Sequence, residues 1–394
     1  MNSHAYEADL QAIRDDRRWR FLREWQGAGG VFQHDGRRYL NFSSNDYLDL
    51  ANHPALKALV REVLENTACG ATASRLMSGN LSIHEALEAA ITKFCGQEST
   101  LVFPSGYQTN VGVLSALAGR GDTIFSDALN HASIIDGARL SRADIQVYRH
   151  NDTSHLAELL AAAPSTGGKI IVTDSVFSMD GDLAPVTELS ALAREYEAVF
   201  VVDEAHAIGI WGEGGGVCKG LEIKPDLITG TLGKSLGSGG AFAAGGAVFR
   251  DLLVNKARSF IYSTGLTPMN AAAGLAAVKL IEAEPTMGEA LLARSAFFQE
   301  QLAARDVPIV RSTTQIVPIM VGDNQRAVDL SEALLAEGLI VTAIRPPTVP
   351  EGTARLRFSV TLGHGEEVLC EAAELVARVL VGDGKVAHDA SLHS

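Results

Sequence analysis

Short apolar runs that each end in polar residues alternate with helical patterns through the middle of the chain. Three such runs are KIIVTD (169–174), AVFVVD (198–203) and DLITGT (226–231). PVTELSALAREYEA (185–198) keeps helical spacing after a proline start, and S-x-x-E at 82–85 predicts a capping box that opens another helix. Alternating strands and helices build a mostly parallel sheet covered by helices, so we predict an α/β fold. Ligands bind beyond the carboxyl ends of such strands, which is where functional residues are expected.

The two ends of the chain have different patterns. The first twenty-odd residues mix charged and apolar positions and predict an amphipathic helical arm, and VFQHDGRRYLNF (31–42) predicts a β-hairpin. Near the C-terminus, VPIVR, QIVPIMV, IVTAI and RLRFSV alternate with helical patches, which indicates a smaller α+β domain. The expected parts are an arm and hairpin (1–45), a large α/β domain (46–285) and a small α+β domain (286–394).

Composition and charge exclude several classes of protein. Charged residues make up 20% and hydrophobic residues 46% of the chain, a balance typical of globular enzymes and not of disordered or collagen-like chains. The net charge of −14 disfavours binding to nucleic acid. The four cysteines form no C-x-x-C pair, so neither a zinc cluster nor a disulfide framework is indicated, and no metal is expected.

No segment of the sequence has the pattern of a membrane anchor or a targeting signal. The uncharged, glycine- and alanine-rich stretch at 235–249 is shorter than the roughly 20 residues of a membrane helix. Residues 1–25 contain acids and arginines without an apolar core of the kind a signal peptide needs. We therefore expect a soluble, cytoplasmic protein.

Three segments at the ends of predicted strands carry candidates for chemistry. VVDEAH leaves Asp203 at a strand end, with His206 three residues further on. GTLGKS places Lys234 in a glycine-flanked turn. PSGYQTN offers Gly106 and the following backbone amides before a helical pattern, and such a helix start binds phosphate well.

Two motifs in this region imitate nucleotide-binding sites. The letters DEAH at 203–206 suggest an NTPase, which requires G-x-x-x-x-G-K-[ST] earlier in the chain. The nearest match includes Lys234, has Ile228 where the first glycine belongs, and follows the acidic motif. GSGGAF (237–242) resembles a dinucleotide fingerprint, but Phe242 replaces the third glycine. We reject both interpretations.

The three segments together meet the requirements of pyridoxal 5′-phosphate (PLP). A lysine at the mouth of a sheet forms a Schiff base with an aldehyde, which PLP supplies. PLP also needs a carboxylate at its pyridine nitrogen and amides around its phosphate. Lys234, Asp203 and the turn at 105–107 meet these three demands. His206 is expected to hydrogen-bond the ring oxygen, and His131 in DALNHAS to stack on the ring.

Motifs between about residue 35 and residue 365 resemble the α-oxoamine synthases, PLP enzymes of the aspartate-aminotransferase fold. These motifs are NFSSNDYL (41–48), SRLMSGN (74–80), SGYQTN (105–110), NHAS (130–133), VFSMDGD (176–182), VDEAH (202–206), TLGKS (231–235), IYST (261–264) and IRPPTVPEGTARLRFS (344–359). The resemblance implies a PLP-dependent transferase of fold type I, with a large domain built on a mostly parallel sheet and a smaller α+β domain. The first and last motifs are most similar to the family member of the biotin pathway, whereas glycine C-acetyltransferase and 5-aminolevulinate synthase differ there.

The resemblance also implies roles for individual residues. The expected catalytic residues are Lys234, which removes the Cα proton, together with His131 and Asp203. The expected cofactor contacts come from the glycine turn, the strand ends and the loops beside them: Gly106, Tyr107, Ser178, Asp203, His206, Thr231, Lys234 and Thr264. Of these, Thr264 is expected to reach the phosphate bound in a partner subunit. The expected substrate contacts are His131, Thr348, Arg357 and Arg20.

Some assignments within the resemblance stay open. Arg357 is expected to hold the amino-acid carboxylate, but Arg355 shares its strand face by the period of two. Arg18 competes with Arg20 for the substrate position in the arm. Ala207-Ile208 departs from the usual family pattern.

The reaction implied by the resemblance condenses L-alanine with a pimeloyl thioester in a homodimer whose active site lies at the subunit interface. The acyl carrier is coenzyme A or a carrier protein. A glycine-using synthase and a PLP-binding protein without turnover are the alternatives.

Overall fold

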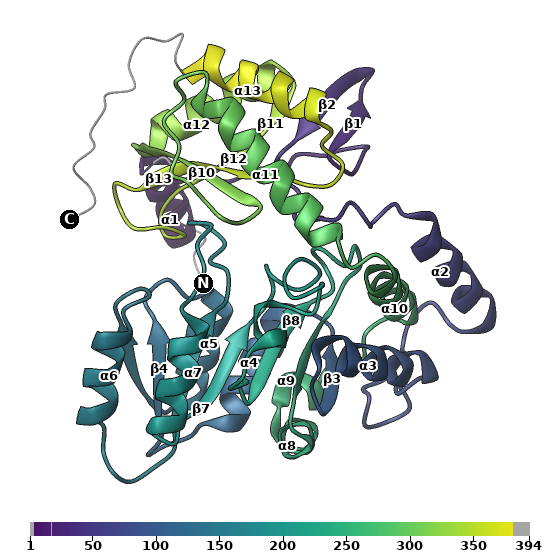
Figure 1. The fold of residues 1–394 in the computed structure, drawn as a ribbon, viewed down its shortest axis with the longest axis vertical. Coiled ribbons are helices and arrows are strands. Elements are labelled where there is room, and N and C mark those ends of the chain that lie inside the picture. The colour runs from purple at the N-terminus through teal and green to yellow at the C-terminus, as the bar shows by residue number, and fades with distance from the viewer. Residues whose placement is uncertain (1–3, 17, 381–394) are drawn as a thin grey trace. The chain divides into compact units, whose positions relative to one another are not determined.

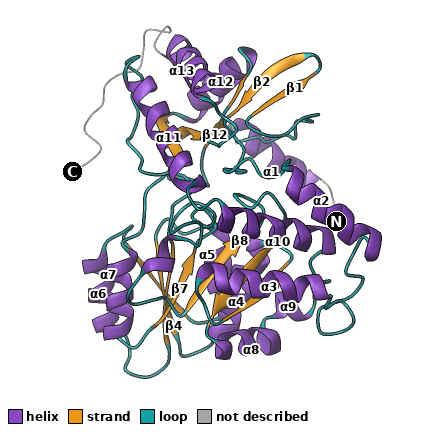
Figure 2. Cartoon of the chain, turned by 45° about the vertical axis from the view of Figure 1, so that its right-hand side comes forward, coloured by secondary structure: helices purple, strands orange, loops and turns teal. Residues whose placement is uncertain are grey.

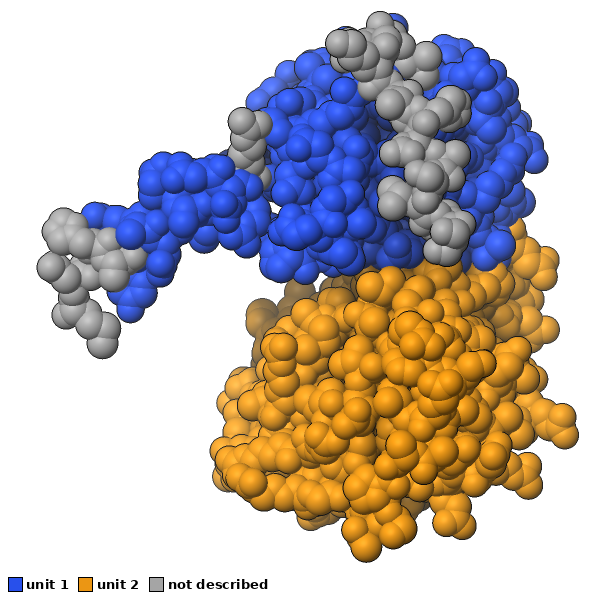
Figure 3. All heavy atoms as spheres, turned by 90° about the vertical axis from the view of Figure 1, so that its left-hand side faces the viewer, with its two compact units in different colours: residues 1–44, 179–181, 291–394 blue, residues 45–178, 182–290 orange. Residues whose placement is uncertain are grey.

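The computed structural model describes residues 4–16 and 18–380. The chain divides into two compact units, which Figure 3 colours separately. Unit 1 draws on residues 1–44, 179–181 and 291–394, and unit 2 consists of residues 45–178 and 182–290. The division into an arm, a large domain and a small domain stays a prediction.

A seven-stranded sheet forms the centre of unit 2 (Figure 1), with the strand order β3-β9-β8-β7-β6-β4-β5. In that order the strands are Ser99–Phe103, Ala241–Gly245, Leu227–Thr231, Val199–Asp203, Lys169–Asp174, Thr123–Asp127 and Asp144–Tyr148. Neighbours from β8 to β5 pair in parallel, whereas β9 pairs antiparallel with both β3 and β8. The predicted mostly parallel sheet is therefore confirmed, and so are the strands expected at the three apolar runs.

Helices cover both faces of this sheet. They are α2 (Pro54–Asn66), α3 (Ser82–Cys95), α4 (Gly106–Leu117), α5 (Ala132–Ser141), α6 (Thr153–Ala162), α7 (Val186–Glu195), the 3₁₀ turn Val217–Gly220, α8 (Ala247–Lys256), α9 (Arg258–Ile261) and α10 (Pro268–Ala283). Figure 2 shows α6 and α7 on one side of the strands and α4 on the other. Apolar side chains of α4 and α5 pack on Val172 and Val201 on one face of the sheet. The neighbouring strand residues Ile171, Phe200 and Val202, which point to the other face, are buried as well, so the strands are apolar on both faces. Within the described ranges, no helix is long and apolar enough to span a membrane.

Unit 1 contains two three-stranded sheets, ordered β1-β2-β11 and β10-β13-β12. Its elements are α1 (His4–Asp15), β1 (Val31–His34), β2 (Arg37–Asn41), β10 (Ile316–Gly322), α12 (Asn324–Ala336), β11 (Leu339–Ile340), β12 (Thr342–Ile344), β13 (Ala354–Ser359) and α13 (Glu366–Leu380), and α11 (Met287–Ala303) enters it at residue 291. The hairpin predicted near Asp35-Gly36 is confirmed, because β1 pairs antiparallel with β2 across that turn. Of the helix predicted over the first twenty-odd residues, the part that forms α1 is confirmed, whereas residues 18–30 form neither helix nor strand.

Two local predictions were wrong. VPIVR (307–311) forms no strand in the structure, and its Pro308 has no N–H to offer a strand ladder. The helix expected at 82–85 does form, but its N-terminal cap differs because the helix already begins at Ser82. The ring of His84 accepts the Leu81 amide at 3.1 Å there, so the serine and the glutamate do not form the predicted capping box.

A buried histidine makes unit 1 sensitive to acid. The His364 ring stacks on Phe42 with 4.2 Å between ring centroids and hydrogen-bonds the Gly30 carbonyl at 3.2 Å. Burial lowers the pKa of His364 from 6.5 to about 4. The unfolded chain therefore binds the proton more readily than the folded chain. As the pH is lowered from 6.5 to about 4, the free energy of unfolding should fall by about 1.4 kcal/mol per pH unit.

Urea unfolding of the wild type and of His364→Gln between pH 7 and pH 4 checks this prediction. Glutamine keeps an amide for Gly30 but does not titrate, so the variant should lose less stability in acid. Equal slopes in the two proteins would contradict the assignment.

Candidate active site

Strand register brings the predicted site segments to one edge of the sheet in unit 2. Ala241, the first residue of β9, pairs with Phe103 at the end of β3 and with Thr231 at the end of β8. Asp203 at the end of β7 pairs with Thr229 of β8. The glycine turn after β3, the lysine turn after β8 and the Asp203 carboxylate therefore belong to the same edge.

The turn that carries Lys234 is fixed by its own hydrogen bonds. The Thr231 hydroxyl accepts the Gly233 amide and donates to the Gly240 carbonyl, both at 3.1 Å. The Lys234 side chain is partly buried, and its Nζ lies 2.7 Å from Nε2 of His206. The structure thus brings together two residues that the sequence singled out 28 positions apart.

The His206 ring is held from its other side by Tyr47. The Tyr47 hydroxyl lies 2.8 Å from Nδ1 of His206 and donates to Oδ1 of Asn45 at 3.0 Å. Because a phenol has a single proton, Tyr47 accepts from the histidine Nδ1–H, and Nε2 is left as an acceptor for Lys234. Tyr47 is fully buried and was missed by the sequence analysis, although it belongs to the motif NFSSNDYL.

The Asp203 carboxylate is buried and oriented by two N–H donors. Oδ2 accepts the side-chain amide of Asn110 at 2.6 Å, and Oδ1 accepts the Ala205 backbone amide at 2.8 Å. Asn110 in turn donates to Ser133 and accepts from Thr229, each at 2.9 Å. Asn110 was also missed, because its contact joins residues 93 positions apart.

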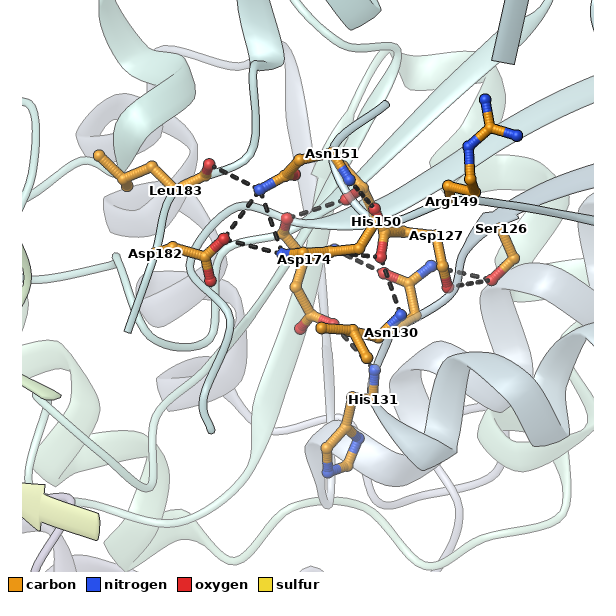
Figure 4. A network of polar contacts seen from close by, with 12 residues as sticks. Ser126, Asp127, Asn130, His131, Arg149, His150, Asn151, Asp174, Asp182 and Leu183 are labelled. Atoms are coloured by element: carbon orange, nitrogen blue, oxygen red, sulfur yellow. Dashed lines mark hydrogen bonds and ion pairs between the residues drawn. The ribbon is translucent and has the colours of Figure 1, made fainter. Parts of the chain in front are cut away.

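His131 caps the N-terminus of α5. Its backbone amide donates to Oδ2 of Asp174 at 2.8 Å, and its Nδ1 lies 2.7 Å from the Ser133 hydroxyl. Figure 4 shows the ring pointing away from the polar network that holds its backbone. His131 is exposed to solvent, but desolvation by the surrounding protein still lowers its pKa. The Asp203 charge opposes this shift and the nearby Lys234 charge adds to it.

The first turn of α4 has the features of a phosphate site. Ser105 caps the helix by accepting the Gln108 amide at 3.3 Å, and Gly106 and Tyr107 are the first helical residues. Amides at such positions have no partner within the helix. The nearest atom to a Cβ built on Gly106 would be 4.0 Å away, in Ala241, so packing of the chain does not itself require a glycine here.

The Tyr107 side chain lies outside this cradle. Its hydroxyl donates to Asp136 on α5, and this hydrogen bond raises the pKa of Tyr107. Only its backbone amide is left to face a ligand at the helix start.

The remaining predicted residues lie elsewhere along the chain. In unit 2, Ser178 is half-buried after β6, and Thr264 is exposed between α9 and α10. In unit 1, Arg357 is buried on β13 and donates to the Ser359 hydroxyl at 2.8 Å, whereas Thr348 and Arg20 are exposed in loops. The contacts of these residues with cofactor or substrate stay predictions.

The two arginines of β13 differ in their surroundings. Arg355 forms an ion pair with Asp180 at 2.5 Å and also donates to the carbonyls of Met179 and Thr353. All of these partners of the Arg355 guanidinium belong to unit 1. In the arm, Arg18 is similarly paired with Asp16 at 2.5 Å.

Comparison with known proteins identifies the family. The model of the family described as aminotransferase class I and II matches residues 37–376, and this chain belongs to that family. Its curated relatives include the 8-amino-7-oxononanoate synthase of Citrifermentans bemidjiense, which is 47% identical and aligned over 95% of this chain and 97% of the relative. The 8-amino-7-oxononanoate synthase of Geobacter metallireducens is 44% identical, with 98% and 100% covered.

Solved structures agree with this assignment. A lysine-to-alanine variant of serine palmitoyltransferase from S. paucimobilis, with a bound PLP–myriocin aldimine, has a TM-score of 0.89 and 28% identity, covering 96% of this chain and 97% of that one. The 8-amino-7-oxononanoate synthase from Francisella tularensis has a TM-score of 0.74 and 28% identity, covering 86% and 97%. The fold class predicted from the sequence, a PLP-dependent transferase of fold type I, is confirmed.

Proposed function

We propose that this chain is an 8-amino-7-oxononanoate synthase that acts in biotin biosynthesis. The reaction joins L-alanine to a pimeloyl thioester and releases CO2 and the free thiol carrier. The observation that carries this proposal is the Lys234–His206 contact beside the oriented Asp203 carboxylate, in a chain 47% identical to a synthase of that name.

The residues of unit 2 fit PLP. The amides that open α4 and the open space at Gly106 suit the phosphate, and the fixed carboxylate of Asp203 suits a protonated ring nitrogen. Lys234 supplies the amine, and the exposed ring of His131 is available for stacking. When bound, the cofactor supplies an aldehyde for the amino group of alanine and a ring that accepts electrons from its Cα.

The side chains of this site divide the proton chemistry among them. Lys234 takes the Cα proton of alanine and returns a proton to the product. His206 accepts a hydrogen bond from Nζ of Lys234 and so restricts the position of the amine that carries the proton. Asp203 keeps the ring nitrogen protonated, because the negative charge of its carboxylate favours the protonated ring. Its two N–H donors hold that carboxylate in one orientation.

Substrate binding is assigned to arginines and to the loop after β12. The planar fork of Arg357 suits the carboxylate of alanine, and the ion pair between Arg355 and Asp180 supports this choice over Arg355. Thr348 and Arg20 are assigned to the acyl substrate. The Asp16 contact of Arg18 supports Arg20 as the arginine of the arm. Coenzyme A and a carrier protein both remain candidate carriers of the acyl group.

We assign a homodimer to the working enzyme. Thr264 is exposed, as expected of a residue that reaches the phosphate held by a partner subunit. An open groove of about 490 Å³ beside the phosphate helix exposes Tyr107 and Leu140, which suits coverage by a second copy. The cytoplasmic location expected from the sequence stays a prediction.

Release of free thiol by the PLP-loaded protein tests the proposed function. Pimeloyl-CoA with L-alanine should release thiol faster than acetyl-CoA with glycine, and release should require both components. A preference for the second pair would move the protein to the glycine-using synthases. No release with either pair, or with a pimeloyl carrier protein and alanine, would support the binder without turnover.

A further inference from the structure

A histidine outside the site described above joins two of its loops. His150 follows β5, and each of its ring nitrogens contacts a different carboxylate: Nδ1 lies 2.9 Å from Asp127 and Nε2 lies 2.8 Å from Asp182. Figure 4 shows the ring between these two side chains. The Asp127 side chain is fully buried, whereas that of Asp182 is partly exposed.

The Asp127 side of this bridge leads to His131. Asp127 ends β4, and its Oδ1 also accepts the Leu129 amide at 2.8 Å, which folds the four residues before His131 into a tight turn. Asn130 in that turn accepts the Asp174 amide at 3.0 Å. Asp174 then accepts the backbone amide of His131, so the carboxylate that binds His150 shapes the loop that presents the His131 ring.

The Asp182 side leads to Ser178. Asp182 accepts the Phe177 amide through its backbone carbonyl at 3.0 Å, next to the bridge between Val176 and Leu183. The His150 and Phe177 rings are perpendicular to each other, with 4.4 Å between ring centroids. Ser178, the expected cofactor contact, follows directly in the chain, so its segment is held by the same histidine.

Charge makes this bridge strong. Burial disfavours a charged imidazole, but the hydrogen bonds and charges of Asp127 and Asp182 outweigh it and raise the pKa of His150 to about 10. The ring is therefore charged at neutral pH and donates from both nitrogens. Asn151 adds neutral bonds to the same two carboxylates, from its backbone amide at 2.9 Å and its side chain at 2.8 Å.

We propose that His150 is a positioning residue that ties the loop carrying His131 to the segment carrying Ser178. It touches neither cofactor nor substrate; it sets the relative placement of two side chains expected to contact the cofactor from different loops. The inference rests on the proposed function for the identity of the cofactor, but not for the identity of the acyl donor.

The variant His150→Gln tests this proposal in the PLP-loaded protein. Glutamine donates to one carboxylate at most with full geometry, so the charged link between the two loops is lost and the neutral bonds of Asn151 alone still join Asp127 to Asp182. We expect the circular dichroism band of the bound cofactor to fall to less than half and kcat to fall by about 10- to 100-fold, as loss of positioning does elsewhere. The matched control is His155→Gln, because His155 lies nearby and its ring accepts the Arg149 amide; it should keep both values.

The cofactor band distinguishes positioning from a purely structural role. A folded His150→Gln protein that has lowered thermal stability but keeps the wild-type cofactor band and kcat would overturn the proposal. If this variant does not fold, the same comparison is made in Asp182→Asn. That variant keeps the bond between His150 and Asp127, so it should show a smaller change in the same direction. The band needs no acyl donor, so it tests the bridge even in a protein inactive with pimeloyl-CoA.

Discussion

Replacing Lys234 by alanine is expected to lower kcat by at least about 10⁴-fold, because one side chain supplies both the amine that holds the cofactor and the base that takes the Cα proton. Nζ of Lys234 lies 2.7 Å from His206. The imidazole of His206 has no primary amine, so it cannot replace Lys234 in holding the cofactor. Borohydride reduction followed by mass spectrometry should fix the cofactor to the wild-type chain and leave the variant unlabelled.

The matched control is Lys234→Arg, which keeps a cation next to His206 but offers no amine for the aldehyde. It should be as unlabelled as the alanine variant and similarly inactive. Turnover near the wild-type rate in either folded variant would remove Lys234 from the mechanism.

The second large effect is expected at Asp203. In Asp203→Asn the side chain can no longer keep a proton on the ring nitrogen. In the wild type the Asn110 amide donates to Oδ2 of Asp203 at 2.6 Å, so in the variant two N–H donors would face each other there. We expect the rate of Cα proton removal to fall by about 10²- to 10³-fold, the range found when a charge-stabilising group is lost. Exchange of the Cα proton of alanine with deuterated water, followed by NMR, measures this step without any acyl donor.

Asp226→Asn provides the comparison for Asp203. Asp226 lies just before β8, and its carboxylate accepts only the Phe200 amide among the contacts described, at 2.8 Å. That variant should exchange the Cα proton at the wild-type rate. An Asp203→Asn protein with the same exchange rate as Asp226→Asn would show that the carboxylate is not the partner of the ring nitrogen.

The central sheet and the core of the site were predictable because both follow from short-range patterns. Strand residues that are buried on two faces are continuously apolar, and the chain becomes polar where the strand leaves the sheet. This pattern is enough to place Asp203 and Lys234 at the ends of strands. The glycine at position 106 gives a comparable local signal for the phosphate turn.

The supporting residues were not predictable in the same way. Tyr47 and His206 are 159 positions apart, and Asn110 and Asp203 are 93 apart, so no local pattern links them. Their side chains meet because register and helix packing bring distant segments together. Motif membership was the only available signal, since Tyr47 and Asn110 both lie within segments that the resemblance had already marked.

The choice between the two arginines of β13 shows a further limit of periodicity. A period of two places Arg355 and Arg357 on one strand face, so the pattern alone makes both equally good candidates for the amino-acid carboxylate. What distinguishes their surroundings is Asp180, which lies 175 positions away from Arg355 in the chain. Among the contacts described, Asp180 pairs with Arg355 and not with Arg357. Ion-pair partners of this kind are set by tertiary structure.

Strand β9 acts as a spacer within the sheet of unit 2. Because Ala241 pairs with Phe103 on one side and Thr231 on the other, the strand ends that carry the phosphate turn and the lysine turn are two inter-strand spacings apart. That corresponds to roughly 9–10 Å, a span maintained by backbone hydrogen bonds rather than by side chains. A small anion such as free phosphate can occupy only one end of this span. A ligand that contacts both turns therefore has to bridge groups that rise from strand ends on either side of β9.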